Sequence, residues 1–338
     1  MLSNRVLTQS KRTKPNENQC LHVPISQSLS TVWPGTTATL GAQTLTPSRF
    51  SLDTLATACV PFEWVTFAYL AWIEAILLLF RKNIAHAPRM ILIHLAIGIS
   101  IILLARASLA SPNPIFQLAR HWYPLLLYIF FFEELQGLVH IIFPGWYDSW
   151  LIQFDFNLAG VHPSVWLAQF ANPTLNDVMQ FAYMTYFPFL VILPALLYAE
   201  KDLISFWTVM TATAVAHYSV YVIAVFLPVE SPFFSLRSLN SAPLTGGPFT
   251  ATINLIEHYG RVHGAAFPSA HVAGSTVAIL AARRYKPWLF WITLPFFLAM
   301  CVATVYGRYH YVADVIAGAA VGIFGWAAGN SLLQKRNA

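Results

Sequence analysis

The chain has 338 residues, of which 57% are apolar and only 10% charged, with a net charge of +5 and a mean hydropathy of +0.57. Soluble globular proteins average about 45–50% apolar and about 25% charged residues, so this composition excludes an ordinary soluble domain. The basic residues fall mostly in turns and tails, which indicates orientation signals in a membrane protein rather than a nucleic-acid surface. The three cysteines are scattered and suggest no disulfide framework.

Residues 1–50 are rich in Ser, Thr, Gln and Pro, and we expect a disordered tail there rather than a domain or a signal peptide. Eight apolar runs follow, each close to the ~20 residues that cross ~30 Å of hydrocarbon, although the sixth is short. They lie at residues 61–80, 90–110, 121–143, 177–199, 203–227, 270–285, 288–308 and 311–333. The sequence therefore predicts an all-α, polytopic membrane helix bundle of about eight spans.

The predicted domain organisation places two accessory spans within residues 51–120 and a membrane catalytic domain within residues 121–335. Eight crossings put both termini on one side of the membrane. The distribution of Lys and Arg favours the cytoplasm for that side, although the cluster at residues 81–89 lies on the other. The loop at residues 228–267 and the polar motifs beside it are then expected on the outer face of a multi-pass protein of the plasma membrane.

Residues 144–176 carry three tryptophans among mixed apolar and polar side chains, which is typical of one or two helices lying at the headgroup level. Such a segment serves either as a floor for a lipid substrate or as an ordinary anchoring loop. Four ionisable residues fall inside predicted spans, and we expect them to form a polar inner seam between helices, or, less favoured, to contact a polyol headgroup. They are Glu133, Glu134, His140 and His217, with Glu133 and His140 on a shared helical face.

Two polar motifs flank a predicted helical hairpin near the C-terminus. Pro268-Ser269-Ala270-His271 opens the sixth apolar run, a basic turn follows at residues 283–286, and the next run ends shortly before His310 and Asp314. Because the hairpin runs out and back, His271 and His310, 39 residues apart, are expected at the same membrane face. Asp314 lies one helical turn after His310 and can hold its imidazole.

These residue types at this spacing point to phosphoryl transfer. Ser269 at a helix start leaves backbone N–H groups that favour a phosphate, and His271 on the first turn can donate a proton to a leaving oxygen. A carboxylate on one ring nitrogen of His310 leaves the other nitrogen free to attack phosphorus and form a phosphohistidine. The alternatives are an ordinary interfacial histidine and a polar pair that merely caps a helix at the headgroups.

The two motifs resemble the second and third signature motifs of the type 2 phosphatidic acid phosphatase superfamily. Pro268, Ser269 and His271 match its Pro-Ser-Gly-His motif, with Ala270 in place of Gly, and His310 and Asp314 match the end of its Ser-Arg-x5-His-x3-Asp motif. The resemblance implies a six-helix membrane core in which His310 is the nucleophile, Asp314 its partner and His271 the general acid. It implies no metal and no other cofactor.

Two departures from that pattern bear on the substrate. Thr304 stands where the third motif has Arg, and the first motif, Lys-x6-Arg-Pro, is replaced by a Pro-rich stretch at residues 227–234. Both features, together with stretches within residues 133–163, are similar to the inositol phosphorylceramide synthase branch, and the resemblance covers about residues 121–330. Arg308 is the best replacement cation, provided that the chain turns at Gly307, and Arg237 and Arg261 are second choices for binding phosphate.

Three classes of function remain open. The favoured one is an integral-membrane lipid phosphatase or phosphotransferase, with inositolphosphotransferase-like transfer as the preferred subtype and simple lipid-phosphate or polyprenyl-diphosphate hydrolysis as the alternative. A metal-dependent hydrolase would add His258 and His263 to the motif residues, but no His-Glu-x-x-His helix is present. A transporter or non-catalytic lipid binder would place its ionisable site at mid-membrane rather than at one edge. The expected partners are a lipid substrate and the bilayer, with no nucleic acid, while the oligomeric state is left open.

Overall fold

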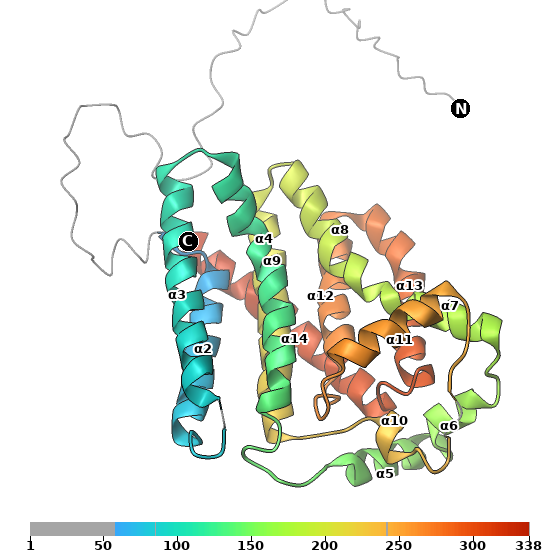
Figure 1. Cartoon of the computed structure of the whole chain (residues 1–338). Coiled ribbons are helices and arrows are strands. Elements are labelled where there is room, and N and C mark those ends of the chain that lie inside the picture. The colour runs from blue at the N-terminus through green and yellow to red at the C-terminus, as the bar shows by residue number, and fades with distance from the viewer. Residues whose placement is uncertain (1–57, 85, 241–242, 338) are drawn as a thin grey trace, which may run out of the picture. The chain divides into compact units, whose positions relative to one another are not determined.

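The computed structural model describes residues 58–84, 86–240 and 243–337, with side chains as far as Gln334, so the predicted tail lies outside the described residues. The described part is built from helices (Figure 1). In chain order they are α2 (Pro61–Leu79), α3 (Ala87–Ala110), α4 (Pro114–Glu134), η1 (Leu135–Gly137), α5 (Asp148–Ala159), α6 (Pro163–Ala168), α7 (Pro173–Met184), α8 (Tyr186–Ala199), α9 (Leu203–Phe226), α10 (Pro232–Ser235), α11 (Pro248–Gly260), α12 (Ala270–Tyr285), α13 (Pro287–Tyr306) and α14 (Val312–Asn337).

The predicted all-α membrane bundle is confirmed. Among the residues that the structure describes, six segments are long and apolar enough to cross a membrane, namely α2, α3, α7 with α8, α9, α13 and α14. The other two predicted spans are helices as well: α12 has only 16 residues, and α4 carries Arg120, Glu133 and Glu134. Both pack inside the same bundle, α12 against α8, α9, α13 and α14, and α4 against α3 and α9.

The third span differs from its predicted limits of 121–143. It begins seven residues earlier, where the Asn113 side chain accepts a hydrogen bond from the Ile115 amide at 2.9 Å and Pro114 supplies the first helical turn. It ends at Glu134, after which the chain tightens into η1 and turns at His140, whose φ of 71° lies in the left-handed region. The helix therefore ends where the backbone forms these turns, and not where the hydrophobic pattern of the sequence ends.

The expected shared face of Glu133 and His140 is therefore wrong. Glu133 is exposed and lies beside Gly260 at the end of α11. The His140 ring packs edge-on against Trp146, with 4.1 Å between ring centroids.

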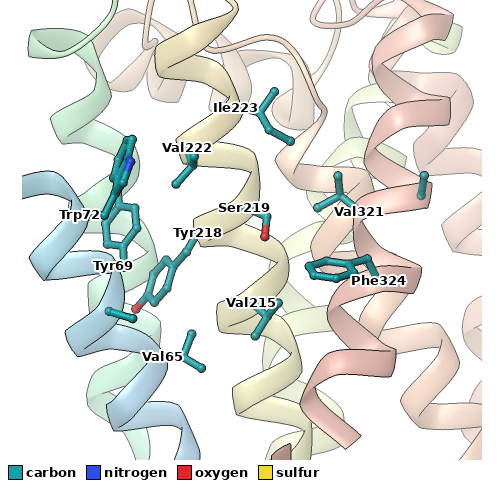
Figure 2. A pocket seen from close by; sticks show the side chains of 12 residues that line it. Val65, Tyr69, Trp72, Val215, Tyr218, Ser219, Val222, Ile223, Val321 and Phe324 are labelled. Carbon is teal, nitrogen blue, oxygen red and sulfur yellow. The ribbon is translucent and has the colours of Figure 1, made fainter. Parts of the chain in front are cut away.

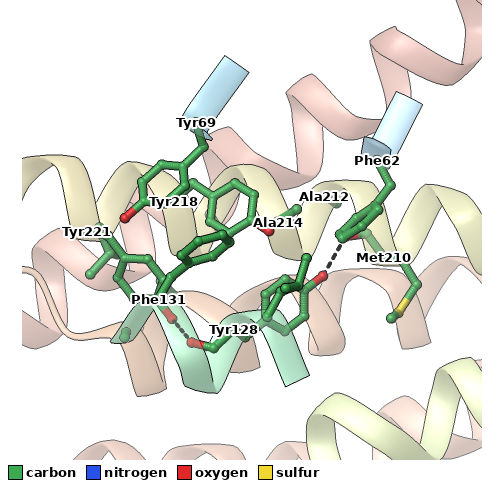
Figure 3. Packing of buried hydrophobic residues seen from close by; sticks show 14 of the residues in the cluster. Phe62, Tyr69, Tyr128, Phe131, Met210, Ala212, Ala214, Tyr218 and Tyr221 are labelled. Atoms are coloured by element: carbon green, nitrogen blue, oxygen red, sulfur yellow. Dashed lines mark hydrogen bonds between the residues drawn. The ribbon is translucent and has the colours of Figure 1, made fainter. Parts of the chain in front are cut away.

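The central helix of the bundle is α9, which is buried on almost every side. Its aromatic face meets α2 and α4 in a dense cluster (Figure 3). Within that cluster the Tyr221 hydroxyl donates to the Tyr128 carbonyl, and the Tyr128 hydroxyl donates to the Met210 carbonyl, both at 2.9 Å. The hydroxyl groups of Tyr128 and Tyr221 are thus paired inside an apolar core, which a membrane interior favours.

Small residues allow α14 to approach two helices closely. A Cβ added at Gly318 would stand 2.5 Å from the Ser269 carbonyl oxygen of the loop that enters α12, and one at Gly325 would stand 2.8 Å from the Ala212 carbonyl oxygen of α9. Gly318 and Gly322 are four residues apart, as are Gly325 and Gly329, and this spacing of small residues is a common way for membrane helices to pack backbone against backbone. The close contact at Gly318 sets the distance between the starts of α12 and α14.

A buried ion pair joins α2, α3 and α4. Arg120 lies 3.0 Å from each carboxylate oxygen of Glu63, and its remaining donors reach the Ser108 hydroxyl at 2.9 Å and the Ala58 carbonyl at 2.6 Å. The Glu63 side chain is fully buried. Such a pair is stable inside a membrane protein because every charge has a partner.

A second polar cluster joins the same three helices. His94 of α3 lies 2.8 Å from Glu74 of α2 and 2.7 Å from Glu134 of α4. Of the four residues expected in a polar seam, only Glu134 takes part in this cluster, and its imidazole is His94 rather than His140. His217 lies elsewhere, on α9, next to the candidate site described below.

An apolar groove of about 660 Å³ lies between α2, α9 and α14 (Figure 2). Tyr69, Tyr218 and Phe324 are among its lining residues. Phe324 follows Asp314 by ten residues, which places it about 15 Å further along α14. The groove thus lies at the depth of the membrane-spanning segments, and none of the seven predicted site residues lines it.

The Glu63–Arg120 pair gives a stability prediction. Arg120→Met leaves the buried Glu63 carboxylate without its cation, so we expect the free energy of unfolding in detergent micelles to fall by about 3–5 kcal/mol. Glu63→Leu combined with Arg120→Met removes both charges and should recover most of that loss, as followed by chemical denaturation. A double variant no more stable than Arg120→Met alone would contradict this account.

Candidate active site

The candidate nucleophile sits in a tight turn between α13 and α14. The turn is closed by the Thr304 carbonyl, which accepts the Tyr309 amide at 3.0 Å and the His310 amide at 3.2 Å. Arg308 takes a left-handed conformation with φ of 64°, which reverses the chain. The turn that the sequence required after Gly307 is therefore present, and it places His310 immediately before the first turn of α14.

Two acceptors hold the same nitrogen of His310. Its Nδ1 lies 2.9 Å from the Ala266 carbonyl oxygen and 3.3 Å from Asp314 Oδ2. A carbonyl oxygen can only accept, so Nδ1 carries the proton and donates to it. In the neutral ring Nε2 is then left with a free lone pair. His310 is 5% exposed and Asp314 is fully buried, so this tautomer is held in a protected environment.

The second histidine lies beside the first, as the hairpin predicted. Ser269 caps α12 by accepting the Val272 amide on its hydroxyl at 3.3 Å, and its own amide donates to the Asp314 carbonyl at 3.1 Å. His271 follows on the first turn of α12, and its ring centroid lies 5.9 Å from that of His310. The two motifs therefore share one site, where α12 and α14 both begin.

A polar chain lies behind His271. His217 donates from Nδ1 to the Thr213 carbonyl at 2.9 Å, so its Nε2 accepts the Tyr186 hydroxyl at 2.8 Å. The Tyr186 ring in turn packs on His271, with 4.4 Å between centroids. Tyr183 packs on His271 as well, at 4.7 Å. His217 thus belongs to the surroundings of the site rather than to an unrelated helix seam.

Helix α5 braces the turn through two buried carboxylates seven residues apart. Asp155 accepts the Val312 and Ala313 amides at 2.8 and 3.0 Å, and so caps α14 from a distant part of the chain. Asp148 accepts the Tyr311 hydroxyl at 2.7 Å and the Glu230 amide at 2.8 Å. The predicted interfacial segment is helical, and it holds the three residues between His310 and Asp314.

The three candidate phosphate-binding arginines occupy different positions. Arg308 is buried and donates to the Asn240 carbonyl at 3.1 Å, and burial lowers the pKa of its guanidinium from the ordinary value. Arg261 is partly buried and paired with Glu257. Arg237 is exposed on the segment after α10.

Thr304, the residue at the usual Arg position of the third motif, donates its hydroxyl to the Cys301 carbonyl at 2.8 Å within α13. Its side chain therefore completes a local helix bond. Any cationic contribution to this site has to come from the turn and from the loops.

The two loop histidines named for a metal site are used otherwise. His258 is exposed and packs on Tyr259, while His263 lies 2.8 Å from Glu230 and packs on Trp146. Across the described ranges, no group of three or more His, Cys, Asp or Glu side chains is arranged to hold a metal ion.

Sequence reasoning missed the residues that support the two motifs. The spacing of Asp148 and Asp155 could have indicated that they share a role, because acidic residues seven apart lie on one face of an amphipathic helix. Nothing in the neighbouring sequence indicates which groups they bind. Tyr183 and Tyr186 sit in an apolar run and read as core. Their contacts with His271 arise from the packing of α7 and α8 against α12 and could not be read from spacing.

The fold and this site define an integral membrane protein with paired histidines at the start of two helices. A family model of the PAP2 superfamily matches residues 149–328, more than half of the chain and all seven predicted site residues. The chain therefore belongs to the PAP2 superfamily, and this membership together with the membrane-length helices supports a membrane function of the lipid phosphatase type. Searches of curated proteins and of solved structures gave no significant match.

The hydrogen bonds from the start of α14 to Asp155 predict how Asp155 variants change stability and hydrogen exchange. Asp155→Ala removes the acceptor of two backbone amides and should lower the free energy of unfolding by about 0.5–2 kcal/mol. Asp155→Asn keeps one acceptor oxygen and should lose less. Hydrogen exchange at the Val312 and Ala313 amides should be fastest in the Ala variant, and equal exchange in the wild type and both variants would show that this cap is unimportant.

Proposed function

We propose that the protein transfers or hydrolyses a phosphate or phospho-alcohol group of a membrane lipid through a phosphohistidine on His310. The observation that carries this proposal is the double acceptor at His310 Nδ1, which leaves Nε2 as the nucleophile. The nearby ring of His271, in its protonated form, is the proton donor to the leaving alcohol.

The reaction proceeds by two successive displacements at phosphorus. In the first, His310 Nε2 attacks phosphorus, the bond from phosphorus to the lipid oxygen breaks, and His271 gives that oxygen a proton. In the second, an incoming hydroxyl or water attacks phosphorus, the phosphorus–nitrogen bond breaks, and the now neutral His271 takes the proton. Asp314 keeps the His310 ring oriented and offsets the positive charge that it gains.

Charge on the phosphoryl oxygens must be offset without the usual motif arginine. The N-terminus of α12 provides partial positive charge and backbone donors at the site, whereas the first amides of α14 are taken by Asp155. Arg308, buried in the same turn as His310, is the first choice for a side-chain cation, and Arg261 the second. Ser269 caps α12 and keeps its first-turn amides oriented, whereas the exposed Arg237 would act only on an approaching headgroup.

Within this reaction type, inositolphosphotransferase-like activity is the favoured subtype. Its support is the sequence resemblance: Thr304 in place of Arg, and the Pro-rich segment after α9 in place of the first motif. In the structure that segment lies next to the nucleophile turn, since the Phe233 amide donates to the Arg308 carbonyl at 3.0 Å. Simple hydrolysis of a lipid phosphate or a polyprenyl diphosphate would use the same residues, and the active site is expected on the outer face.

Substitution of the nucleophile or its partner tests the mechanism. His310→Ala and Asp314→Ala should each lower turnover by about 10³-fold or more, because one removes the attacking nitrogen and the other its orientation. Purified protein would be assayed with phosphatidic acid, with a polyprenyl diphosphate, and with phosphatidylinositol plus an acceptor lipid. Activity that persists after exhaustive chelation would also exclude the metal-dependent alternative.

His258→Ala is the matched control, since that histidine is exposed on α11 and should leave turnover unchanged. Full activity in either His310→Ala or Asp314→Ala, with all variants folded, would end the proposed mechanism. No activity of the wild type on any of these lipids would favour a non-catalytic lipid binder.

A further inference from the structure

We propose that Glu257 selects the substrate by accepting hydrogen bonds from the hydroxyl groups of a headgroup carried on the transferred phosphate, so that a phosphodiester lipid with a polyol headgroup is preferred to a phosphomonoester. This inference rests on the proposed function, and it concerns a residue outside the signature motifs.

Glu257 lies on the face of α11 that is turned towards the bundle. Helix α11 packs over the side of the bundle that carries the candidate active site. At its start, the Thr250 amide donates to Asp177 of α7 at 2.8 Å. One turn later, Ile253 is fully buried in a cluster with Tyr183 and, at its margin, Tyr309. Glu257 follows Ile253 by four residues, so it continues the same face of the helix.

The aromatic rings beneath this face lead directly to the histidines. Tyr183 and Tyr309 pack on each other with 4.4 Å between centroids, and Tyr183 packs on His271 at 4.7 Å. The His271 ring is in turn 5.9 Å from that of His310. The inner face of α11 therefore lies over one wall of the two-histidine site.

Arg261 fixes the position of the carboxylate. It forms an ion pair with Glu257 one helical turn away, and its guanidinium lies 4.0 Å from the ring centroid of Phe233. The Phe233 amide donates to the carbonyl of Arg308, two residues before the nucleophile. Glu257 is thus connected to the nucleophile turn through Arg261 and Phe233.

The Glu257 carboxylate is largely shielded from solvent. Its side chain is 19% exposed and that of Arg261 is 23% exposed. Burial raises the pKa of Glu257, while the ion pair with Arg261 opposes that rise.

A carboxylate beside a phosphate site discriminates between lipid classes. A phosphomonoester carries about −1.5 to −2 charges at neutral pH, whereas a phosphodiester carries a single charge and is repelled less. An ionised carboxylate is an acceptor only, and hydroxyl groups of a polyol are the donors that suit it. A bare phosphomonoester has no headgroup hydroxyl to donate to this carboxylate, so Glu257 favours a hydroxylated headgroup.

The test compares lipids that share their acyl chains and differ in the headgroup. We expect Glu257→Gln to lower kcat/KM for phosphatidylinositol and phosphatidylglycerol by about tenfold or more, since a charge-assisted hydrogen bond is weakened. For phosphatidic acid the same variant should keep or raise kcat/KM, because a repulsive charge is removed. Glu257→Asp, which keeps the charge on a shorter side chain, should fall between the wild type and Glu257→Gln.

Glu200→Gln is the control, since this exposed carboxylate pairs with Lys286 at the other end of α12 and should change neither activity. Parallel losses on all three lipids in Glu257→Gln would overturn the inference and assign the residue a purely structural role, as would a wild type that acts on phosphatidic acid alone. A wild type inactive on every lipid would instead overturn the proposed function, and this inference with it.

Discussion

The structure of the site depends on one hydrogen-bond donor, the Nδ1–H group of His310, which has the Ala266 carbonyl and the Asp314 carboxylate as its acceptors. Ala266 precedes α12 and Asp314 opens α14, so a single N–H group joins the two motifs that the sequence separates. The same contact decides which nitrogen faces the substrate, because a carbonyl accepts but never donates. If the ring were turned or its tautomer reversed, the histidines would still be neighbours, but neither the free Nε2 nor the bond from Nδ1 to Ala266 would remain.

Much of the surrounding chain serves to hold that geometry. Gly318 allows α14 to approach the entry of α12, and Asp155 of α5 caps α14 from a segment more than 150 residues away in sequence. The left-handed Arg308 makes the reversal that brings His310 back to the site. Non-glycine residues in this conformation are uncommon and cost free energy, so the bonds around the turn have to offset that cost.

The parts that could be predicted are those that local chemistry decides. Hydrophobic runs of membrane length located the helices, and the helical hairpin between His271 and His310 predicted their meeting, because two successive spans return the chain to the same face. The His310–Asp314 contact followed from the four-residue spacing. By contrast, His94 is the imidazole of the polar seam, since that contact depends on how α2, α3 and α4 pack. The role of Asp155 depends equally on tertiary packing, which spacing does not reveal, and the end of α4 at Glu134 is set by the turns that follow it.

The central claim is that His310 becomes covalently phosphorylated, and the most direct measurement is to trap that species. Purified protein would be mixed rapidly with a lipid labelled on phosphorus, denatured at high pH, digested, and the labelled peptide identified by mass spectrometry. The account predicts a label on His310 that is lost in mild acid and retained in base, and that is absent in the His310→Ala variant. A label on another residue, or efficient turnover with no trapped phosphoenzyme, would contradict it.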